Sequence, residues 1–255
     1  MEEFRFIDLE VHSAFENMAI DESIMLSMKE GKVKPTLRLY RWSPSGVSIG
    51  TFQGMMDEVD IDFCKAQNIN AIRRITGGGA VYHDYNGEIT YSIILPKGHR
   101  FAPDDIIASY KIICKGLVMA LDHLGIQAEF KPINDVVTGG KKISGNAQTR
   151  RYSCVLQHGT TILDLDVNVM FQALKVPKEK ISDKMIADVK QRVTSIREVL
   201  NRKVSMDELK HALQFGFSEA LGINLVKGQL TTKEQETSKR LAEEKYSVHE
   251  WNFKR

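Results

Sequence analysis

The stretch Arg73-Arg74-Ile75-Thr76-Gly77-Gly78-Gly79-Ala80-Val81-Tyr82-His83-Asp84 decides how this chain is organised. Its three consecutive glycines give the backbone access to positive φ and leave no side chain in the way of a closely approaching ligand. An apolar, alternating segment from Ile89 to Leu95 follows, which predicts that the glycines form a loop between two strands. We interpret the segment as a ligand-binding loop, in which Arg74 can reach a bound carboxylate or phosphate.

A run of three glycines has a simpler interpretation, because an isolated run is more often a flexible hairpin or linker. The run is not a P-loop, since no Gly-Lys-Ser or Gly-Lys-Thr closes it, and it is not a spaced dinucleotide fingerprint. Its function therefore depends on what the rest of the chain places beside it.

Composition restricts the class of protein. The 255 residues are 42% hydrophobic and 27% charged, which is typical of a globular protein with a substantial core. With 35 basic and 33 acidic residues the formal net charge is +2, so nothing favours nucleic acid as a partner. No apolar run approaches the ~18 residues of a membrane span, and Cys64, Cys114 and Cys154 are irregularly spaced. We expect a cytoplasmic protein that binds neither membrane nor nucleic acid.

Periodicity predicts alternating helices and strands. Segments 4–9, 37–42 and 47–53 alternate as strands, and the turn at 43–46 predicts that the second and third form a hairpin. Helical spacing is found at 13–29, 57–68, 103–124, 169–174, 180–188, 205–221 and 232–245. Asp21 and Glu22 lie in the middle of the first helix, where charges on a solvated face are far commoner than a general-base pair.

Two further blocks carry candidate site residues. In the segment from Asn134 to Gln148, strand-like pieces flank Gly139-Gly140, and Lys142 is followed by Ile143-Ser144-Gly145. A lysine near a turn is usually just solvated, although the small residues beside it would admit a ligand. The other block is Gln157-His158-Gly159-Thr160, and a lone histidine is more often structural than catalytic.

Taken together, the three blocks resemble the lipoate–protein ligase A family of the biotin/lipoate ligase superfamily, and the related octanoyltransferases. The resemblance implies an α/β (α+β) fold with a mixed β-sheet flanked by helices. We expect residues 1–255 to form a single catalytic domain without the C-terminal accessory domain that many of these ligases carry.

The same resemblance implies an ATP-dependent lipoate–protein ligase. Such an enzyme activates lipoate with ATP and Mg²⁺ to lipoyl-AMP, and then transfers the lipoyl group to a lysine of a lipoyl-carrier domain. The carrier would be the E2 lipoyl domain of an oxo-acid dehydrogenase or the H protein of glycine cleavage. Because the accessory domain is missing, a separate accessory-domain protein is expected as a further partner.

The resemblance also assigns roles to residues. Lys142 and Asp135 are the expected catalytic residues, and Asp135 is also the expected Mg²⁺ ligand. The residues expected to bind the lipoyl and AMP groups are Arg74, Gly77, Gly78, Gly79, Ala80, Val81, Tyr82, His83, Lys142, Ser144, Gly145, Ala147, His158, Gly159 and Thr160.

Two alternatives remain open. An octanoyltransferase would move an acyl group from a carrier-protein thioester through a cysteine acyl-enzyme, which requires an accessible thiolate near the lysine. No cysteine occurs in the segment before Asp135, and Cys154 is the only thiol near the three blocks. The other alternative is a non-catalytic acyl- or nucleotide-binding module. The preference for lipoate or octanoate depends on the depth of the pocket, which the sequence does not give.

Overall fold

The computed structural model describes residues 1–175 and 191–255. Within them the strands form two sheets: an eight-stranded mixed sheet of order β11-β1-β2-β6-β10-β9-β8-β7 and a three-stranded sheet of order β4-β3-β5. The strands are β1 (Glu2–His12), β2 (Thr36–Trp42), β3 (Gly46–Ile49), β4 (Asn70–Arg73), β5 (Val81–His83), β6 (Glu88–Pro96), β7 (Glu129–Lys131), β8 (Asp135–Thr138), β9 (Lys141–Arg151), β10 (Cys154–Ile162) and β11 (Ile223–Lys227).

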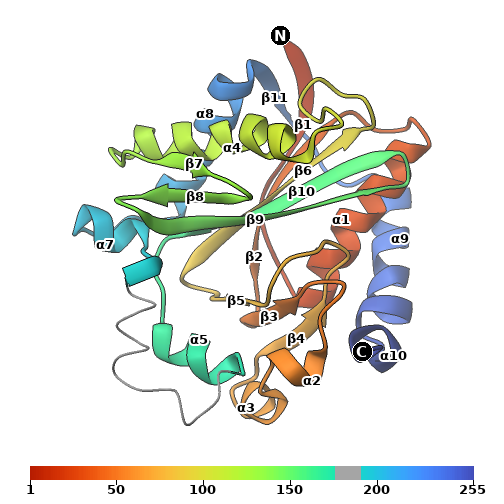
Figure 1. The fold of residues 1–255 in the computed structure, drawn as a ribbon. Coiled ribbons are helices and arrows are strands. Elements are labelled where there is room, and N and C mark those ends of the chain that lie inside the picture. The colour runs from red at the N-terminus through yellow and green to blue at the C-terminus, as the bar shows by residue number, and fades with distance from the viewer. Residues whose placement is uncertain (176–190) are drawn as a thin grey trace.

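The helices cover both faces of the large sheet, as Figure 1 shows. They are α1 (Ala14–Lys29), α2 (Met55–Glu58), α3 (Ile61–Ala66), α4 (Ile106–His123), α5 (Val167–Ala173), α7 (Ile196–Leu200), α8 (Met206–Leu221), α9 (Thr232–Leu241), the π-helical turn η2 (Ala242–Tyr246) and α10 (His249–Asn252). The predicted class, a mixed sheet flanked by helices, is confirmed.

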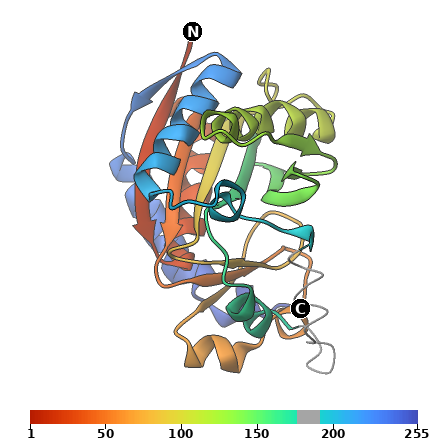
Figure 2. The ribbon, with the colours of Figure 1, turned by 90° about the vertical axis from the view of Figure 1, so that its left-hand side faces the viewer.

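Alternate residues of the central strands feed two hydrophobic cores. On β6, Tyr91, Ile93 and Leu95 pack with α4 and α8, whereas Ile94 packs with α1 on the opposite face. This is the two-residue period of a strand that is buried on both sides. Figure 2 shows the sheet between these helical layers, with the two chain ends at opposite ends of the molecule.

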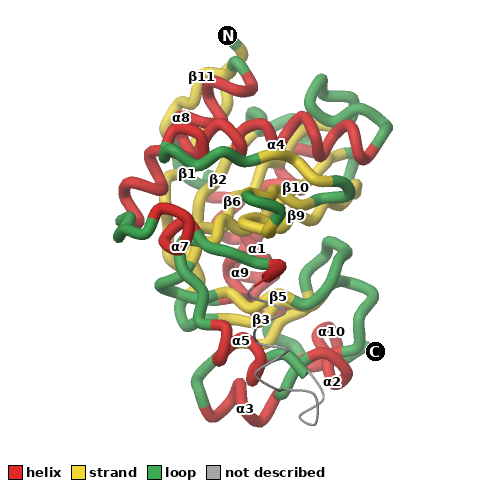
Figure 3. Tube along the Cα trace, turned by 60° about the vertical axis from the view of Figure 1, so that its left-hand side comes forward, coloured by secondary structure: helices red, strands yellow, loops and turns green. Residues whose placement is uncertain are grey.

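The glycine-rich stretch lies in the small sheet. Strands β4 and β5 flank it, and both pair with β3. The strand predicted after the glycines, at 89–95, is β6, and the short β5 comes before it. Figure 3 shows this sheet below the large one, beside α5, α2 and α3. The predicted hairpin of 37–42 and 47–53 is wrong, because β2 pairs with β1 and β6 of the large sheet while β3 starts the small one. At the turn between β2 and β3 the chain passes from the large sheet to the small one. The alternation of apolar residues predicts strands but does not show which strands pair.

Capping residues fix the ends of the long helices close to the predicted positions. Ser13 caps α1 and forms a reciprocal capping box with Glu16, and the carboxylate of Asp105 caps α4. Each cap accepts hydrogen bonds from N–H groups that the first turn leaves unpaired. The helix expected at 180–188 lies outside the described residues. None of the described helices has both the length and the hydropathy needed to cross a bilayer.

Candidate active site

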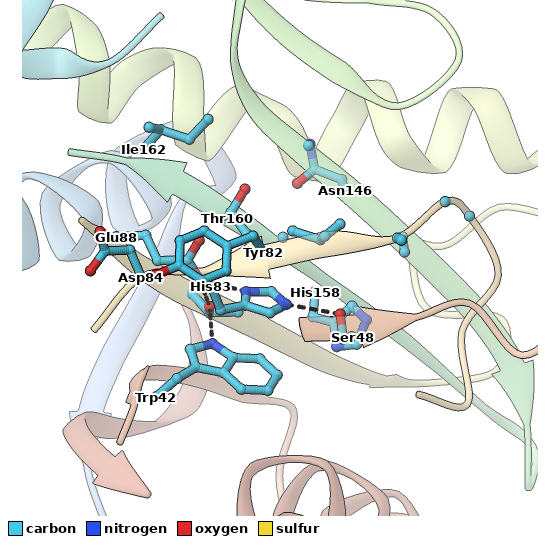
Figure 4. Close-up of a pocket in the computed structure, with 18 of the residues that line it drawn as sticks. Trp42, Ser48, Tyr82, His83, Asp84, Glu88, Asn146, His158, Thr160 and Ile162 are labelled. Atoms are coloured by element: carbon cyan, nitrogen blue, oxygen red, sulfur yellow. Dashed lines mark hydrogen bonds and ion pairs between the residues drawn. The ribbon is translucent and has the colours of Figure 1, made fainter. Parts of the chain in front are cut away.

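A pocket of about 280 Å³ lies where the two sheets meet, near the lower end of the size of small-molecule sites. Figure 4 shows part of it. Most of its walls are apolar, and its polar side chains come from both sheets. The lining residues are Met18, Tyr40, Trp42, Ser48, Arg74, Gly78, Gly79, Ala80, Val81, Tyr82, His83, Asp84, Gly87, Glu88, Thr90, Asn134, Lys142, Gly145, Asn146, Ala147, His158, Gly159, Thr160, Ile162, Asp164, Leu165, Met170, Leu174 and Val193.

Arg74 holds the glycine loop in shape. Its Nη2 donates to the carbonyl oxygens of Gly77 at 2.7 Å and Gly79 at 2.8 Å. Its Nη1 donates to the backbone and the hydroxyl of Ser48, and its Nε donates to Thr76. Burial lowers the pKa of the guanidinium to about 10, so it remains charged at neutral pH. Arg74 lies at the predicted site, but its donors are committed to protein acceptors.

Lys142 reaches the pocket because of a β-bulge. Asp135 pairs with Gly145 and Val137 with Lys142, with a register shift between the two pairs. The extra residue on β9 turns Lys142 to the same face as Asp135 and Gly145. There the Lys142 ammonium lies 2.7 Å from Oδ1 of Asp135. The sequence predicted the pair, and the bulge explains how it forms.

The segment after the undescribed residues closes one side of this position. The backbone N–H of Thr194 donates to the carbonyl oxygen of Lys142 at 2.8 Å, and Val193 borders the pocket. A contact between residues so distant in sequence fixes the backbone of β9 beside the ammonium. Val193 therefore belongs to the wall of the site, and Thr194 anchors the backbone beside it.

His158 is tied to a fully buried carboxylate. Its Nε2 lies 2.8 Å from Oγ1 of Thr76, and its Nδ1 lies 3.5 Å from Oδ2 of Asp21. Burial lowers the pKa of His158 and outweighs the opposing attraction of Asp21. A neutral imidazole therefore borders the pocket at neutral pH.

The interpretation of Asp21 and Glu22 as solvated charges is wrong. Asp21 is buried and accepts from Arg38, Tyr40 and Ser92. Glu22 is also buried and accepts from Tyr152, Lys245 and Tyr246. Both sides of α1 are covered, one by the large sheet and one by the C-terminal helices, so charges in mid-helix meet partners from distant elements. Helical periodicity in the sequence cannot show that other elements pack on both sides of α1.

Ser48 and Glu88, which the sequence did not single out, lie on either side of the predicted residue His83 in the wall of the pocket. His83, on β5, lies between Ser48 of β3 and Glu88 of β6, and Trp42 stacks on its ring with centroids 3.9 Å apart. Figure 4 shows His83 above Trp42, with a dashed line to Ser48. Ser48 and Glu88 are ordinary strand positions in sequence; the pairing of β3 with β5 brings Ser48 to His83, and the approach of β6 brings Glu88 to its other side.

The structure brings most of the predicted site residues together. Among the predicted residues, the pocket is lined by Arg74, Gly78, Gly79, Ala80, Val81, Tyr82, His83, Lys142, Gly145, Ala147, His158, Gly159 and Thr160. Asp135 stands behind Lys142, while Gly77 and Ser144 lie outside the lining. Of two aromatics near the predicted hairpin, Trp42 is buried in the wall and Phe52 is 70% exposed.

The three cysteines are buried and none of them lines the pocket. Burial raises the pKa of Cys64 and Cys154 to about 11 and that of Cys114 to about 12. The thiol of Cys154 donates to the carbonyl oxygens of Met25 and Tyr152. These are inert core thiols, so Cys154 lacks the accessibility and the low pKa of a nucleophile.

In the parts of the chain that the structure describes, no group of three or more His, Cys, Asp or Glu side chains is arranged to hold a metal ion. Asp135 faces the ammonium of Lys142 instead of other carboxylates. The expected Mg²⁺ ligand therefore has no support from its surroundings.

Fold and site together define a protein acylation enzyme. Residues 13–218 match the family of the lipoyl protein ligase A/B catalytic domain, and the chain belongs to this family. The resemblance found in the sequence is confirmed, and the chain is an enzyme of that family.

Individual proteins of known sequence or structure are similar to this chain over nearly its full length. The chain is 35% identical to "Octanoyltransferase LipM" of Brevibacillus brevis and 37% identical to that of Kyrpidia tusciae, with 100% of both chains covered in each case. Among solved structures, a bi-partite lipoate protein ligase from Thermoplasma acidophilum matches with a TM-score of 0.88 and 35% identity, covering 99% of this chain and 96% of that one. A lipoate-protein ligase A bound with ATP matches with a TM-score of 0.84 and 32% identity, covering 98% of each.

The expectation of an ATP-dependent lipoate–protein ligase is wrong on this comparison. Curated relatives aligned over the full length of the chain are octanoyltransferases, among them that of Bacillus subtilis at 34% identity. The three motif blocks are shared by the ligases and the transferases of the superfamily, so they identify the pocket without distinguishing the two reactions. The ATP and acyl-adenylate expectations depended on the ligase and lose their support with it.

Proposed function

We propose that this chain is an octanoyltransferase, which moves an octanoyl group from the thioester of an acyl carrier protein to a lysine of a lipoyl-carrier domain. The observation that carries the proposal is the pocket between the sheets, where an apolar wall leads to the Lys142–Asp135 pair. An apolar wall suits a fatty acyl chain, and the names of the full-length relatives support transfer of an octanoyl group.

A thioester donor makes activation by a nucleotide unnecessary. A free carboxylate is a poor electrophile, whereas a thioester carbonyl is opened directly by a nucleophile as the thiolate leaves. Negative charge then develops on the carbonyl oxygen, and a fixed positive charge beside it lowers the barrier. We assign this role to the ammonium of Lys142, with Asp135 as the residue that positions it.

The carrier of the acceptor lysine is proposed to be the lipoyl domain of an oxo-acid dehydrogenase or the H protein of glycine cleavage. The solved neighbour from Thermoplasma acidophilum was studied with its E2 lipoyl domain, which supports this class of acceptor. We further propose that residues 1–255 act as one catalytic domain. Because the thioester already carries the activation, we expect the chain to need no accessory-domain protein.

Transfer from a defined donor tests the proposal. The purified chain is incubated with octanoyl-acyl carrier protein and an apo lipoyl domain, without nucleotide, and the mass of the lipoyl domain is followed. We expect one octanoyl group to be added, and this addition to disappear with Lys142→Ala. Modification that occurs only from free octanoate or lipoate with ATP, and not from the carrier thioester, would overturn the proposal.

A further inference from the structure

A hydroxyl, an imidazole and a carboxylate form a continuous row in the wall of the pocket. Oγ of Ser48 lies 2.8 Å from Nε2 of His83, and Nδ1 of His83 lies 2.7 Å from Oε1 of Glu88. All three side chains border the pocket (Figure 4). A nucleophile within hydrogen-bond reach of a base, with the base oriented by a third group, is the arrangement of an activated hydroxyl nucleophile.

The hydrogen bonds run in one direction along the row. Nη1 of Arg74 donates to Oγ of Ser48 at 3.2 Å, and an arginine has no acceptor. The Ser48 hydroxyl therefore accepts from Arg74 and still has its own proton, which it can donate to Nε2 of His83 when that nitrogen is unprotonated. Glu88 accepts at the other end, which places the His83 proton on Nδ1 and leaves Nε2 as a base. The tautomer follows from the partners at both ends.

The sheets hold the row rigidly. Ser48 and His83 are on paired strands of the small sheet, whereas Glu88 begins β6 of the large sheet. Oε1 of Glu88 also accepts from Thr90, whose hydroxyl accepts from the indole N–H of Trp42. Because Trp42 also stacks on His83, the imidazole is fixed on its face and at its edge. Such support by neighbouring groups is what keeps a catalytic constellation in position.

Because the three cysteines lie away from the pocket, no thiol is available to accept the octanoyl group as a cysteine acyl-enzyme. None of the cysteines borders the pocket, yet the pocket contains a hydroxyl held against a base. We propose that Ser48 receives the octanoyl group as an ester, with His83 as the general base and Glu88 as its positioning residue. This inference rests on the proposed octanoyltransferase function and replaces the cysteine acyl-enzyme within it.

The first half-reaction loads the enzyme. The Ser48 hydroxyl transfers its proton to Nε2 of His83 as Oγ forms a bond to the thioester carbonyl carbon. The resulting oxyanion collapses, the carbon–sulfur bond breaks, and the departing carrier thiolate takes the proton from Nε2. An octanoyl ester on Ser48 and a free carrier thiol remain, with His83 neutral again.

The second half-reaction transfers the group to the acceptor. The neutral amine of the acceptor lysine attacks the ester carbonyl and gives a proton to Nε2 of His83. The bond between the carbonyl carbon and Oγ of Ser48 breaks, and Oγ takes that proton back. The product is an octanoyl amide on the carrier domain, so protons and bonds balance without any further reactant.

A loading experiment tests the nucleophile directly. The intact chain is mixed with octanoyl-acyl carrier protein in the absence of acceptor, quenched in acid, and analysed by intact mass and by peptide mapping. We expect one octanoyl adduct, mapped to Ser48 and absent in Ser48→Ala. The control Ser23→Ala removes another buried hydroxyl, which bonds only to a carbonyl of its own helix, and should load as the parent does.

A second variant separates chemistry from packing. Ser48→Cys keeps the size of the side chain and offers a thiol to the same base. We expect its adduct to become a thioester, cleaved rapidly by neutral hydroxylamine, whereas the Ser48 ester resists the same treatment. A residue that only packs would show no such change in the lability of the adduct. If Ser48→Ala fails to fold, Ser48→Cys still tests whether the side chain at position 48 carries the octanoyl group.

His83 and Glu88 have a separate readout. Glu88→Gln should lower the loading rate by about a hundredfold, within the range expected for loss of general-base efficiency, and should move the pH profile of loading. His83→Asn should lose loading at every pH. Loading that is unchanged in both variants would overturn the roles assigned to them.

The outcomes distinguish the inference from the function on which it rests. If the parent chain octanoylates the lipoyl domain but carries no adduct on Ser48, or carries it on a cysteine, the serine route is overturned and the transferase stands. If Ser48 is loaded but no lipoyl domain is modified, the serine route stands and the proposed acceptor fails. If neither loading nor transfer occurs from the carrier thioester, both are overturned.

Discussion

The ammonium of Lys142 lies 2.7 Å from Oδ1 of Asp135 across a bulged pair of strands. Both side chains are about one-third exposed, with 38% and 33% of their surfaces open to solvent. An ion pair at this depth contributes little to stability, because solvent screens it. The pair holds the Lys142 ammonium in the wall of the pocket, which is the position our proposal requires.

Lys142→Ala should therefore remove activity without unfolding the protein. We expect a loss of about a hundredfold or more in the rate of transfer, which is typical when one stabilising contact to an oxyanion is removed. The thermal unfolding temperature should change little. Steady-state transfer assays and calorimetry measure the two quantities.

The neighbouring lysine provides a matched control for that variant. Lys141 pairs with Glu198 on the surface at 3.4 Å and does not line the pocket. Lys141→Ala should keep the parent rate. Equal losses in both variants would show that general charge, and not the position of Lys142, matters.

Gly145→Ala should displace the lysine without removing it. A Cβ at Gly145 would lie 2.6 Å from both Cε and Nζ of Lys142, closer than any real contact, so the flexible side chain must move. We expect the transfer rate to fall while the fold persists. In a double-mutant cycle with Lys142→Ala, the glycine change should have no further effect, because residues that act through one group are not additive. Additive losses would contradict this explanation.

Asp21→Asn should destabilise the protein strongly. The change preserves shape but removes the carboxylate charge that lies 3.1 Å from the fully buried guanidinium of Arg38, and leaves it only the more distant Glu10 at 3.7 Å. Removing one member of a buried pair typically costs about 3–5 kcal/mol. Urea denaturation measures the free energy of unfolding, and a loss below 1 kcal/mol would contradict the importance of this pair.

The same carboxylate predicts a pH dependence of stability. Burial of Asp21 would by itself raise its pKa, but hydrogen bonding from His158 and the charge of Arg38 outweigh burial, and the net pKa lies below the ordinary value of 3.8. The unfolded chain therefore binds the proton more readily than the folded one. The stabilisation is fully present above pH 3.8 and is lost as the pH falls through the depressed value. Unfolding free energies measured from pH 6 downward should fall more steeply for the parent than for Asp21→Asn.

Removal of all three cysteines should leave transfer intact. Their thiols have pKa values raised by burial to about 11 and 12 and stand away from the pocket. We expect iodoacetamide at neutral pH to modify the folded protein slowly, without loss of activity. A chain with each cysteine changed to alanine should also octanoylate the lipoyl domain. Rapid inactivation by alkylation would show that a thiol takes part.

Much of the fold follows from local pattern. The capping residues Ser13 and Asp105 mark where long helices begin, and alternation predicts β2 and β6, because these signals depend on neighbours within a few residues. The false hairpin at 43–46 shows the limit: a turn between two alternating segments fits strands that pair and strands that separate into different sheets equally well. The choice depends on β1 and β6, which lie far away along the chain.

The sequence alone provided the three motif blocks, at 73–84, 134–148 and 157–160, and their resemblance to one family predicted a shared pocket, which residues of all three blocks line. The tertiary structure decided the rest. It placed a bulge that turns Lys142 toward Asp135, buried the thiols, and aligned Ser48, His83 and Glu88 across two sheets. Such alignments depend on strand register and on which faces are covered, and these properties belong to contacts between distant segments that no local pattern specifies.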